Sequence, residues 1–478
     1  MNKLKFFLEN FLIYGVGGVI GKIIPVVMIP IITRLMPDTS SFGISDMCTT
    51  VVSFGSALAI MGMYDAMYRM FFEKNDEKYK KEICSTTLNF TVIMSVIVFV
   101  LMIVFKNFIA VKFLGDIKYG YLVYITAIST LVGATNSIVA APTRMQNKRK
   151  IYLFMNVLTP LISYSIAIPM ILKGYYIEAL PVSTMVANIS SELVFLALNR
   201  KWFTFAFINK EELKQLLKIA VPLLPNFLIY WVFNSSDKLM ITNILGTGAT
   251  GIYSVGAKLG QASQLIYTAF AGGWQFFAFS TMKEENQVKT NSLIFEYLGV
   301  ISFACTAGIF LICQPLYNLL FQGEYVRGYI VSPYLFLAPL LQMLFQIACN
   351  QFLVIKKTWP NLFILSTGAV VNVILNLVLI PQIGIEGAAI ATLVGYLVSD
   401  VICVLVLMKM KLMVISRRFV FSALAMIVYI LIWRLCTKDN IGINLIMTIA
   451  IVVFYIILFR SDLKSLIIAA KGEKNETA

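Results

Sequence analysis

The feature that most constrains this chain is a succession of apolar runs, each long enough to cross a bilayer, separated by short loops. A spanning helix needs roughly twenty mostly apolar residues. Hydrophobic residues make up 59% of the 478 positions and charged residues only 13%, a balance that a water-soluble surface could not cover. The sequence therefore predicts an all-α integral membrane protein with about fourteen transmembrane helices, over 11–32, 43–69, 83–105, 121–141, 151–172, 180–198, 219–245, 250–280, 293–315, 330–355, 361–380, 385–408, 418–436 and 441–459.

The basic residues are divided unevenly between the loops. With the N-terminus placed in the cytoplasm, the inner segments carry 27 Lys and Arg and the outer segments carry 7. Cytoplasmic loops of membrane proteins carry just such an excess of positive charge. The pattern predicts that both termini are cytoplasmic. It also explains the net charge of +15 by topology, so that no nucleic-acid partner is expected.

Several kinds of chemistry are excluded by what the chain lacks. It has no His, and its seven Cys are scattered without a CxxC pair, so neither a metal site nor a disulfide framework is predicted. No predicted loop is longer than about twenty residues, and none contains the GxxxxGK[ST] phosphate-binding loop. We therefore expect no cofactor, no catalytic residues and no ATP hydrolysis.

The order of spans predicts four parts. Six spans make a first lobe at 1–205, and six more make a second lobe at 219–410. Because six is even, both lobes enter the membrane in the same direction, as a parallel repeat does. Between them, Asn209 and Glu212 form a capping-box-like start to a short interfacial helix, within a linker at 206–218. Two additional spans and a cytoplasmic tail fill 411–478.

Ionisable residues inside spans are the candidates for function. On insertion scales each costs about 2.5–3.5 kcal/mol at mid-span, so it usually faces a partner or a water-filled cavity. The clearly intramembrane set is Lys22, Asp65, Arg69, Glu192, Asp237, Lys238, Lys258 and Asp400. Four others lie near span ends, where they can reach water: Asp46, Glu296, Glu386 and Arg434.

Spacing separates these candidates. Lys22 lies in the middle of the first span with no acid three or four residues away, so it either contacts an anionic substrate or pairs with an acid on another span. Asp65 and Arg69 are four residues apart, which favours an ion pair on one helix face. Asp237 and Lys238 are adjacent, point about 100° apart and cannot share a neighbour. They end the polar run 234–238, which is hard to reconcile with a lipid-facing surface.

Four groups of residues together resemble the polysaccharide (O-antigen type) flippases of the multidrug/oligosaccharidyl-lipid/polysaccharide exporter superfamily. The resemblance extends over the whole chain and includes twelve spans followed by two more. It rests on the joint order of IPIITRL at 29–35, Phe42-Gly43, Gly62…Ala66…Arg69, and Pro222-Leu223…Trp231…Asn234…Asp237-Lys238…Gly251-Ile252-Tyr253.

The resemblance implies a function. Such a protein moves a polyprenyl-diphosphate-linked oligosaccharide from the cytoplasmic to the outer leaflet of the bacterial inner membrane, by alternating access, for O-antigen (lipopolysaccharide) or capsule synthesis. Membrane lipids, glycosyltransferases and a polysaccharide polymerase are the implied partners. Substrate-binding cations would be Lys22, Arg34, Arg69, Lys238 and Lys258, and Asp65, Glu192, Asp237 or Asp400 would couple transport to H⁺ or Na⁺.

Two alternatives stay open at this point. A multidrug/cation antiporter of the same superfamily shares the architecture, although the two extra spans and the intramembrane lysines argue against it. An oligosaccharide polymerase or ligase is equally polytopic but resembles proteins with a long outer loop. Because the longest predicted outer loop, 106–120, has only about fifteen residues, an enzyme is not expected.

Overall fold

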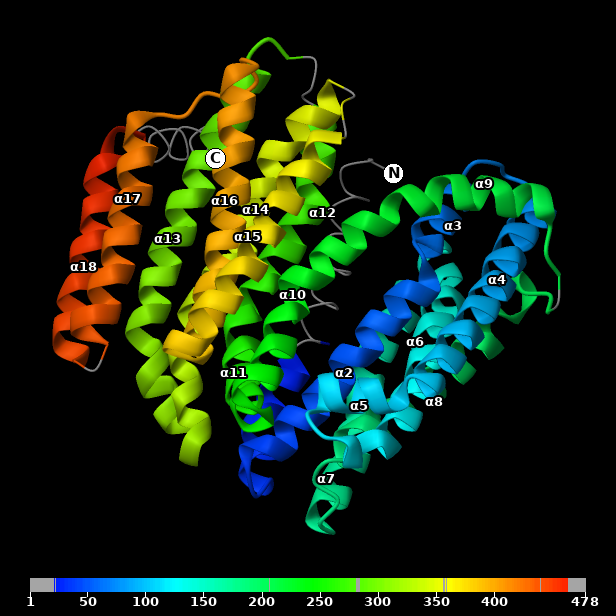
Figure 1. Cartoon of the computed structure of the whole chain (residues 1–478). Coiled ribbons are helices and arrows are strands. Elements are labelled where there is room, and N and C mark those ends of the chain that lie inside the picture. The colour runs from blue at the N-terminus through cyan, green and yellow to red at the C-terminus, as the bar shows by residue number, and fades with distance from the viewer. Residues whose placement is uncertain are drawn as a thin grey trace, which may run out of the picture. The chain divides into compact units, whose positions relative to one another are not determined.

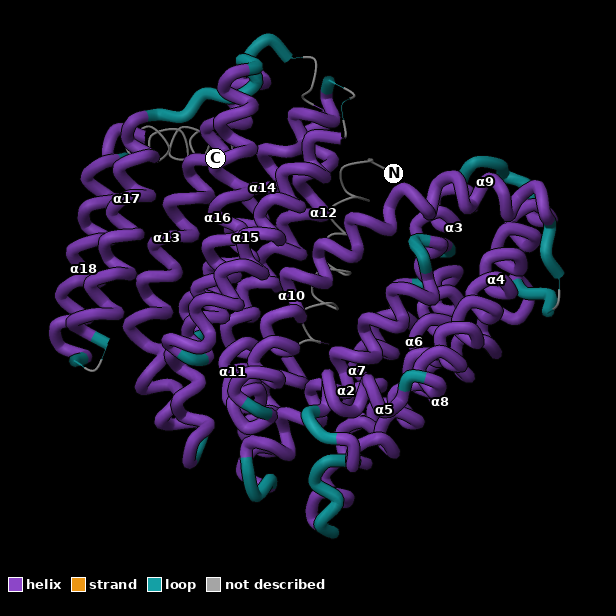
Figure 2. Tube along the Cα trace, viewed as in Figure 1, coloured by secondary structure: helices purple, strands orange, loops and turns teal. Residues whose placement is uncertain are grey.

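The computed structural model describes Gly21, 23–205, 207–280, 284–355, Lys357, 359–438 and 440–462. All regular structure among these residues is helical, and the helices are joined by short loops (Figures 1 and 2). The main helices are α2 (Thr39–Ile60), α3 (Met63–Phe71), α4 (Glu77–Val104), α5 (Lys106–Leu114), α6 (Gly120–Met145), α7 (Arg149–Leu172), α8 (Ala179–Asn199), α9 (Lys210–Ala220), α10 (Leu224–Leu245), α11 (Thr247–Gly260), α12 (Gln264–Ser280), α13 (Gln287–Leu320), α14 (Ser332–Val354), α15 (Trp359–Ile383), α16 (Ile385–Lys409), α17 (Arg417–Ile432) and α18 (Ile441–Leu458).

Twelve helical segments of the described chain are long and apolar enough to cross a membrane. Two of the fourteen predicted spans are not among them. The first, 11–32, lies mostly outside the described residues, and its end is the shorter apolar helix Ile23–Leu35. The other, 250–280, is divided into α11 and α12, each shorter than a full span. The prediction of an all-α multi-pass membrane protein is confirmed, and the count of fourteen is approximate.

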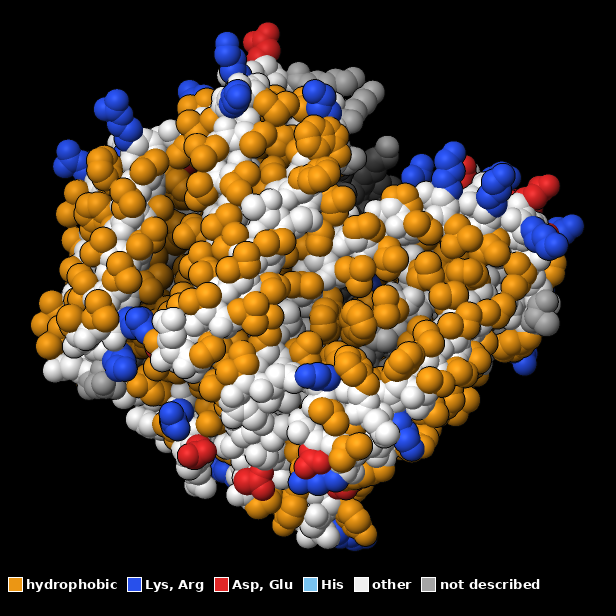
Figure 3. All heavy atoms as spheres, in the orientation of Figure 1, with side chains coloured by type: hydrophobic (Ala, Val, Ile, Leu, Met, Phe, Trp, Pro, Cys, Tyr) orange, Lys and Arg blue, Asp and Glu red, His pale blue; other side chains and the backbone are white. Residues whose placement is uncertain are grey.

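The sides of the helices carry the apolar surface that a bilayer requires. Val104, Leu193 and Leu435 are 68%, 62% and 73% exposed, which in water would be costly. Figure 3 shows hydrophobic side chains covering the visible sides of the helices, while most Lys and Arg gather near helix ends. This distribution places lipid, rather than water, around the helix sides.

Two predicted features were wrong in detail. The predicted span 43–69 is not one helix: Met61 and Gly62 have φ of 48° and 76°, which ends α2, and α3 begins after them. A Cβ at Gly62 would lie only 2.7 Å from the carbonyl oxygen of Ala220, so glycine is required there. The predicted outer loop 106–120 also contains a helix, α5. Apolar length alone does not reveal a break made by backbone conformation.

By their contacts the described residues form two compact units. Unit 1 holds the described residues up to Leu259 together with Leu320–Gly328 and Leu365–Gly395, and unit 2 holds the remainder. In unit 1, α6 packs against α2, α4 and α8, and in unit 2, α12 packs on α14 and α17 on α18 (Figure 1). The lobes expected from the repeat, 1–205 and 219–410, stay a prediction.

The predicted helix after Asn209 is present as α9. The Asn209 side chain accepts hydrogen bonds from the backbone N–H groups of Glu211 and Glu212, at 3.0 and 3.3 Å. This satisfies two donors that the first turn of a helix leaves unpaired. α9 lies across the ends of α3 and α4, which it contacts (Figure 1).

Candidate functional site

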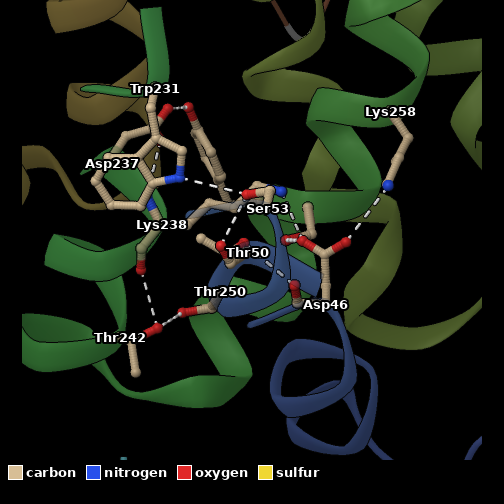
Figure 4. Close-up of polar contacts among 11 residues, drawn as sticks. Asp46, Thr50, Ser53, Trp231, Asp237, Lys238, Thr242, Thr250 and Lys258 are labelled. Carbon is tan, nitrogen blue, oxygen red and sulfur yellow. Dashed lines mark hydrogen bonds and ion pairs between the residues drawn. The ribbon is translucent and has the colours of Figure 1, made fainter. Parts of the chain in front are cut away.

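The most concentrated group of charges in unit 1 joins three helices around one carboxylate. Asp46 of α2 accepts a contact of 2.6 Å from the Lys238 ammonium of α10 on its Oδ2 atom, and its Oδ1 atom lies 3.4 Å from the Lys258 ammonium of α11. The Ser254 hydroxyl donates to the same Oδ2 atom at 2.8 Å. Figure 4 shows Asp46 with Lys258 on one side and Lys238 on the other. We call Asp46, Lys238, Lys258 and Ser254 the Asp46 cluster.

The members of the Asp46 cluster are buried to different degrees. The side chains of Asp46 and Lys238 are 5% and 13% exposed, whereas that of Lys258 is 37% exposed. A buried carboxylate requires counter-charges and hydrogen bonds, and this one has two cations and a hydroxyl. Lys258 is therefore the member of the cluster that a ligand can reach most readily.

A second polar group adjoins the cluster on α10. The Tyr253 hydroxyl donates to Asp237 Oδ2, and the backbone N–H of Lys238 donates to Asp237 Oδ1 at 2.8 Å. The adjacent side chains of Asp237 and Lys238 thus reach different partners, Tyr253 and Asp46, as their spacing predicts. Ser235, Ser236 and Asp237 are buried, so this part of the polar run does not face lipid, whereas Asn234 is exposed.

The polar group continues onto α15 and α16. The Ser236 hydroxyl donates to the side-chain oxygen of Asn372 at 3.4 Å, and the Asn372 amide donates to Thr392 at 3.1 Å. Asn376 donates to Asn372 at 3.3 Å. Carboxylate, amide and hydroxyl oxygens are the donors that hard cations prefer. No three His, Cys, Asp or Glu side chains come together as metal ligands in the part of the chain that the structure describes.

A close crossing of two helices brings the Asp46 cluster together. A Cβ at Gly43 would lie 2.0 Å from the carbonyl oxygen of Thr247, and one at Gly251 would lie 1.9 Å from the carbonyl oxygen of Thr39. On each helix the threonine lies four residues before the glycine, so α2 and α11 contact each other through equivalent positions. Small residues allow such backbone contact inside membranes. Three residues past each glycine lie Asp46 and Ser254, which the crossing places in hydrogen-bonding contact.

Aromatic residues support the same region. The Trp231 indole N–H of α10 donates to the Ser53 hydroxyl of α2 at 3.3 Å (Figure 4). The Trp231 ring also lies 4.6 Å, centroid to centroid, from Phe54. These contacts join α2 to α10 two helical turns from Asp46.

The other predicted site residues lie apart from the Asp46 cluster. Lys22 falls outside the described residues. Arg34 helps to line a cavity of about 450 Å³, and Glu192 lies on α8 near Thr135. Asp65 and Arg69 are exposed on α3 and form no ion pair with each other in the described structure, so the pairing that their spacing favours was wrong.

Asp400 lies in unit 2 and has different surroundings. It is 5% exposed, and neither of its carboxylate oxygens has a hydrogen-bond partner among the described residues. The predicted cations Lys238 and Lys258 therefore share a site with each other, while Asp400 stands by itself.

The residue that sequence reasoning missed is Asp46. Its place near a span end suggested that it reaches water, but it is buried and ion-paired. Glu296 and Glu386 are likewise buried, at 2% and 7% exposure, and Glu296 accepts hydrogen bonds from Ser416 at the start of α17. Arg434 is half-buried. Counting from the shared Gly43-Ile44 and Gly251-Ile252 pairs would have aligned Asp46 with Ser254.

Solved structures share this fold. The lipid II flippase MurJ in an inward closed conformation matches with a TM-score of 0.67 and 14% identity, over 95% of this chain and 99% of that one. A multidrug resistance MATE family transporter of the MOP superfamily matches in its inward-facing conformation with a TM-score of 0.62 and 14% identity, over 82% and 98% of the two chains. Its outward-facing conformation gives 0.58 and 15%, over 85% and 95%. The fold is that of MOP-superfamily transporters.

The sequence defines the family more closely. A family model described as polysaccharide biosynthesis protein matches residues 7–283, and the chain belongs to that family. No curated protein matches the sequence. The resemblance to polysaccharide flippases of this superfamily, drawn from the ordered motifs, is confirmed, and the family and its structural neighbours are transporters rather than enzymes.

Proposed function

We propose that this protein flips a polyprenyl-diphosphate-linked oligosaccharide from the cytoplasmic to the outer leaflet of a bacterial inner membrane. The exported unit would serve O-antigen or capsule synthesis, alongside glycosyltransferases and a polymerase. The single observation that carries the proposal is the pair of lysines at one carboxylate, Lys238 and Lys258, in a member of a polysaccharide biosynthesis family. Two ammonium groups within reach of one anion suit a diphosphate.

Alternating access between lobes at 1–205 and 219–410 would move the sugar and diphosphate, while the polyprenyl tail stays in lipid. Lys22, Arg34 and Arg69 would meet the substrate at other stages of the cycle. The solved MurJ structure, described as that of a lipid II flippase, supports this fold for a lipid-linked substrate. Both termini would be cytoplasmic, as the distribution of basic residues predicts.

Ion coupling would use one of the predicted carboxylates. Asp237 is favoured because the Tyr253 hydroxyl of α11 bonds to it, and because the neighbouring Ser236 is joined to amide and hydroxyl groups of α15 and α16. Asp65, Glu192 and Asp400 are the remaining candidates. One elementary charge moving across 100 mV yields about 2.3 kcal/mol, which is enough to bias the two access states.

The test is reconstitution. The purified chain in proteoliposomes should move a fluorescent lipid-linked oligosaccharide to the opposite leaflet without ATP, and faster with an H⁺ or Na⁺ gradient. In cells, Lys22→Ala should abolish surface glycan while the protein still inserts, and Lys22→Arg should keep part of the activity because the charge remains. Exchange of organic cations for ions without movement of the glycolipid would support the antiporter instead.

A further inference from the structure

The Asp46 cluster holds an anion of the protein's own where a phosphate group would bind. Both oxygens of Asp46 are used: Oδ2 meets Lys238 and Oδ1 faces Lys258. A phosphate group presents oxygens to ammonium groups in the same way, since both anions accept charge-assisted hydrogen bonds. The carboxylate and a phosphate would therefore compete for the same two lysines.

The two contacts of Asp46 are unequal. The Lys238 contact is 2.6 Å and nearly buried, whereas the Lys258 contact is 3.4 Å and involves the most exposed side chain of the cluster. Lys258 is thus the point at which an arriving anion can displace Asp46 first. Lys238 would follow, because a bound phosphate retains further oxygens once one is engaged.

The exchange would change the contact between helices. Asp46 belongs to α2, while both lysines and Ser254 belong to α10 and α11. At the nearby crossing, Gly43 and Gly251 bring the backbones of α2 and α11 into close contact. The two ion pairs of Asp46 join α2 to α10 and α11, and moving the lysines onto a ligand weakens this link to the Ser254–Asp46 and Trp231–Ser53 hydrogen bonds described above.

Asp46 and Asp237 already balance the two lysines, so a competing ligand needs more than one negative charge. Lys238 and Lys258 face Asp46, and Asp237 lies beside Lys238 with its own hydrogen bond from Tyr253. A single negative charge would only replace Asp46. A diphosphate supplies additional negative charge and more oxygens that accept hydrogen bonds. These contacts offset the cost of leaving the Asp46 carboxylate without its lysines.

We propose that Asp46 is a built-in competitor, which occupies the phosphate position on Lys238 and Lys258 until a diphosphate displaces it, and that this exchange weakens the contact of α2 with α10 and α11. The identity of the diphosphate as that of a lipid-linked glycan rests on the proposed function. The competition itself rests on the geometry of the Asp46 cluster.

The test uses the purified full-length chain in detergent, with inorganic pyrophosphate and a polyprenyl diphosphate as separate probes. Asp46→Asn removes the competing charge and keeps the shape, so pyrophosphate should bind about tenfold more tightly than to the wild type. Lys258→Met should weaken binding in both backgrounds. Asp116→Asn is the matched control, because Asp116 pairs with Lys118 at 3.3 Å on the surface and should leave the affinity unchanged.

A second variant protects the test against poor folding of Asp46→Asn. Ser254→Ala keeps all charges but removes one hydrogen bond to Asp46, which should tighten pyrophosphate binding by a few-fold. Unchanged or weaker binding of both probes in Ser254→Ala, or in folded Asp46→Asn, would overturn the competition. Tighter binding of only the polyprenyl diphosphate would retain it and assign the site to a lipid headgroup.

Hydrogen exchange tests the weakened contact of α2. Amides in 39–46 and 247–254 should exchange faster when pyrophosphate is added to the wild type, and should already be fast in Asp46→Asn. Slower or unchanged exchange in the wild type with ligand bound would contradict this weakening. If these results hold while proteoliposomes fail to move any lipid-linked glycan, the phosphate site stands and the proposed function fails.

Discussion

Two buried aspartates, one in each unit, show how differently the same residue can be accommodated. Asp46 in unit 1 is 6% exposed and has two ammonium groups and a hydroxyl around it. Asp400 in unit 2 is 5% exposed, yet its carboxylate oxygens have no hydrogen-bond partner among the described residues. Judged by their exposed fractions alone, the two aspartates would be equivalent.

The difference indicates that Asp400 is the aspartate that can bind and release an ion, whereas Asp46 is paired with lysines of the protein itself. A buried carboxylate is costly unless it is paired, neutralised by a proton, or bound to a cation. Asp46 meets this requirement with the protein's own lysines. Asp400 can meet it only with a proton or a cation from outside the described structure, as the coupling role predicted for it requires. Removing a lysine partner of Asp46 should therefore destabilise the protein strongly, whereas neutralising Asp400 should change its stability little.

The largest expected effect is on the Asp46 side of this comparison. Lys238→Met leaves Asp46 with the longer ion pair to Lys258 and the Ser254 hydrogen bond, so the free energy of unfolding should fall by about 3 kcal/mol. Thermal or denaturant unfolding in detergent measures it. Adding Asp46→Asn to the same chain should restore most of the loss, because no buried carboxylate is then left uncompensated. A double variant as unstable as Lys238→Met would show that the lysine contributes by packing instead.

The helix crossing that assembles the Asp46 cluster should give the next largest effect. Gly43→Ala places a Cβ against the Thr247 carbonyl, and the resulting displacement should destabilise the protein by about 2 kcal/mol. Gly308→Ala on α13 is the matched control, because no atom lies within 4 Å of its Cβ position. That variant should be more stable by about 0.5 kcal/mol. Equal stabilities for the two variants would mean that α2 and α11 can separate without cost.

The smallest effect on stability is expected at Asp400. Asp400→Asn removes no hydrogen bond or ion pair that the described structure contains, so unfolding should change by less than about 1 kcal/mol. If Asp400 binds the coupling ion, the same variant should lose the acceleration of transport by an H⁺ or Na⁺ gradient. A loss of several kcal/mol would reveal a structural partner and remove the contrast with Asp46. Normal coupling would leave Asp237, Glu192 or Asp65 as the coupling residue.

Much of the fold could be predicted because bilayer thickness acts on each span separately. Most predicted spans agree with helices of the structure to within a few residues, as at 151–172 for α7 and 385–408 for α16. The failures lie where backbone conformation interrupts an apolar run. Met61 and Gly62 divide 43–69, and a short 3-10 segment at Gln261–Ser263 separates α11 from α12. Hydropathy contains no signal for either break.

The sequence by itself determined that this chain is a multi-pass membrane protein, approximately where most of its spans lie, and which lysines are candidates for an anionic substrate. Those properties depend on the residues of one segment at a time. Only the tertiary structure decided that Lys238 and Lys258 meet at Asp46, across 192 and 212 positions of sequence, and that Asp65 and Arg69 do not pair. The physical reason is that a buried charge is stabilised by residues of the neighbouring helices. Packing at Gly43 and Gly251 sets which residues those are.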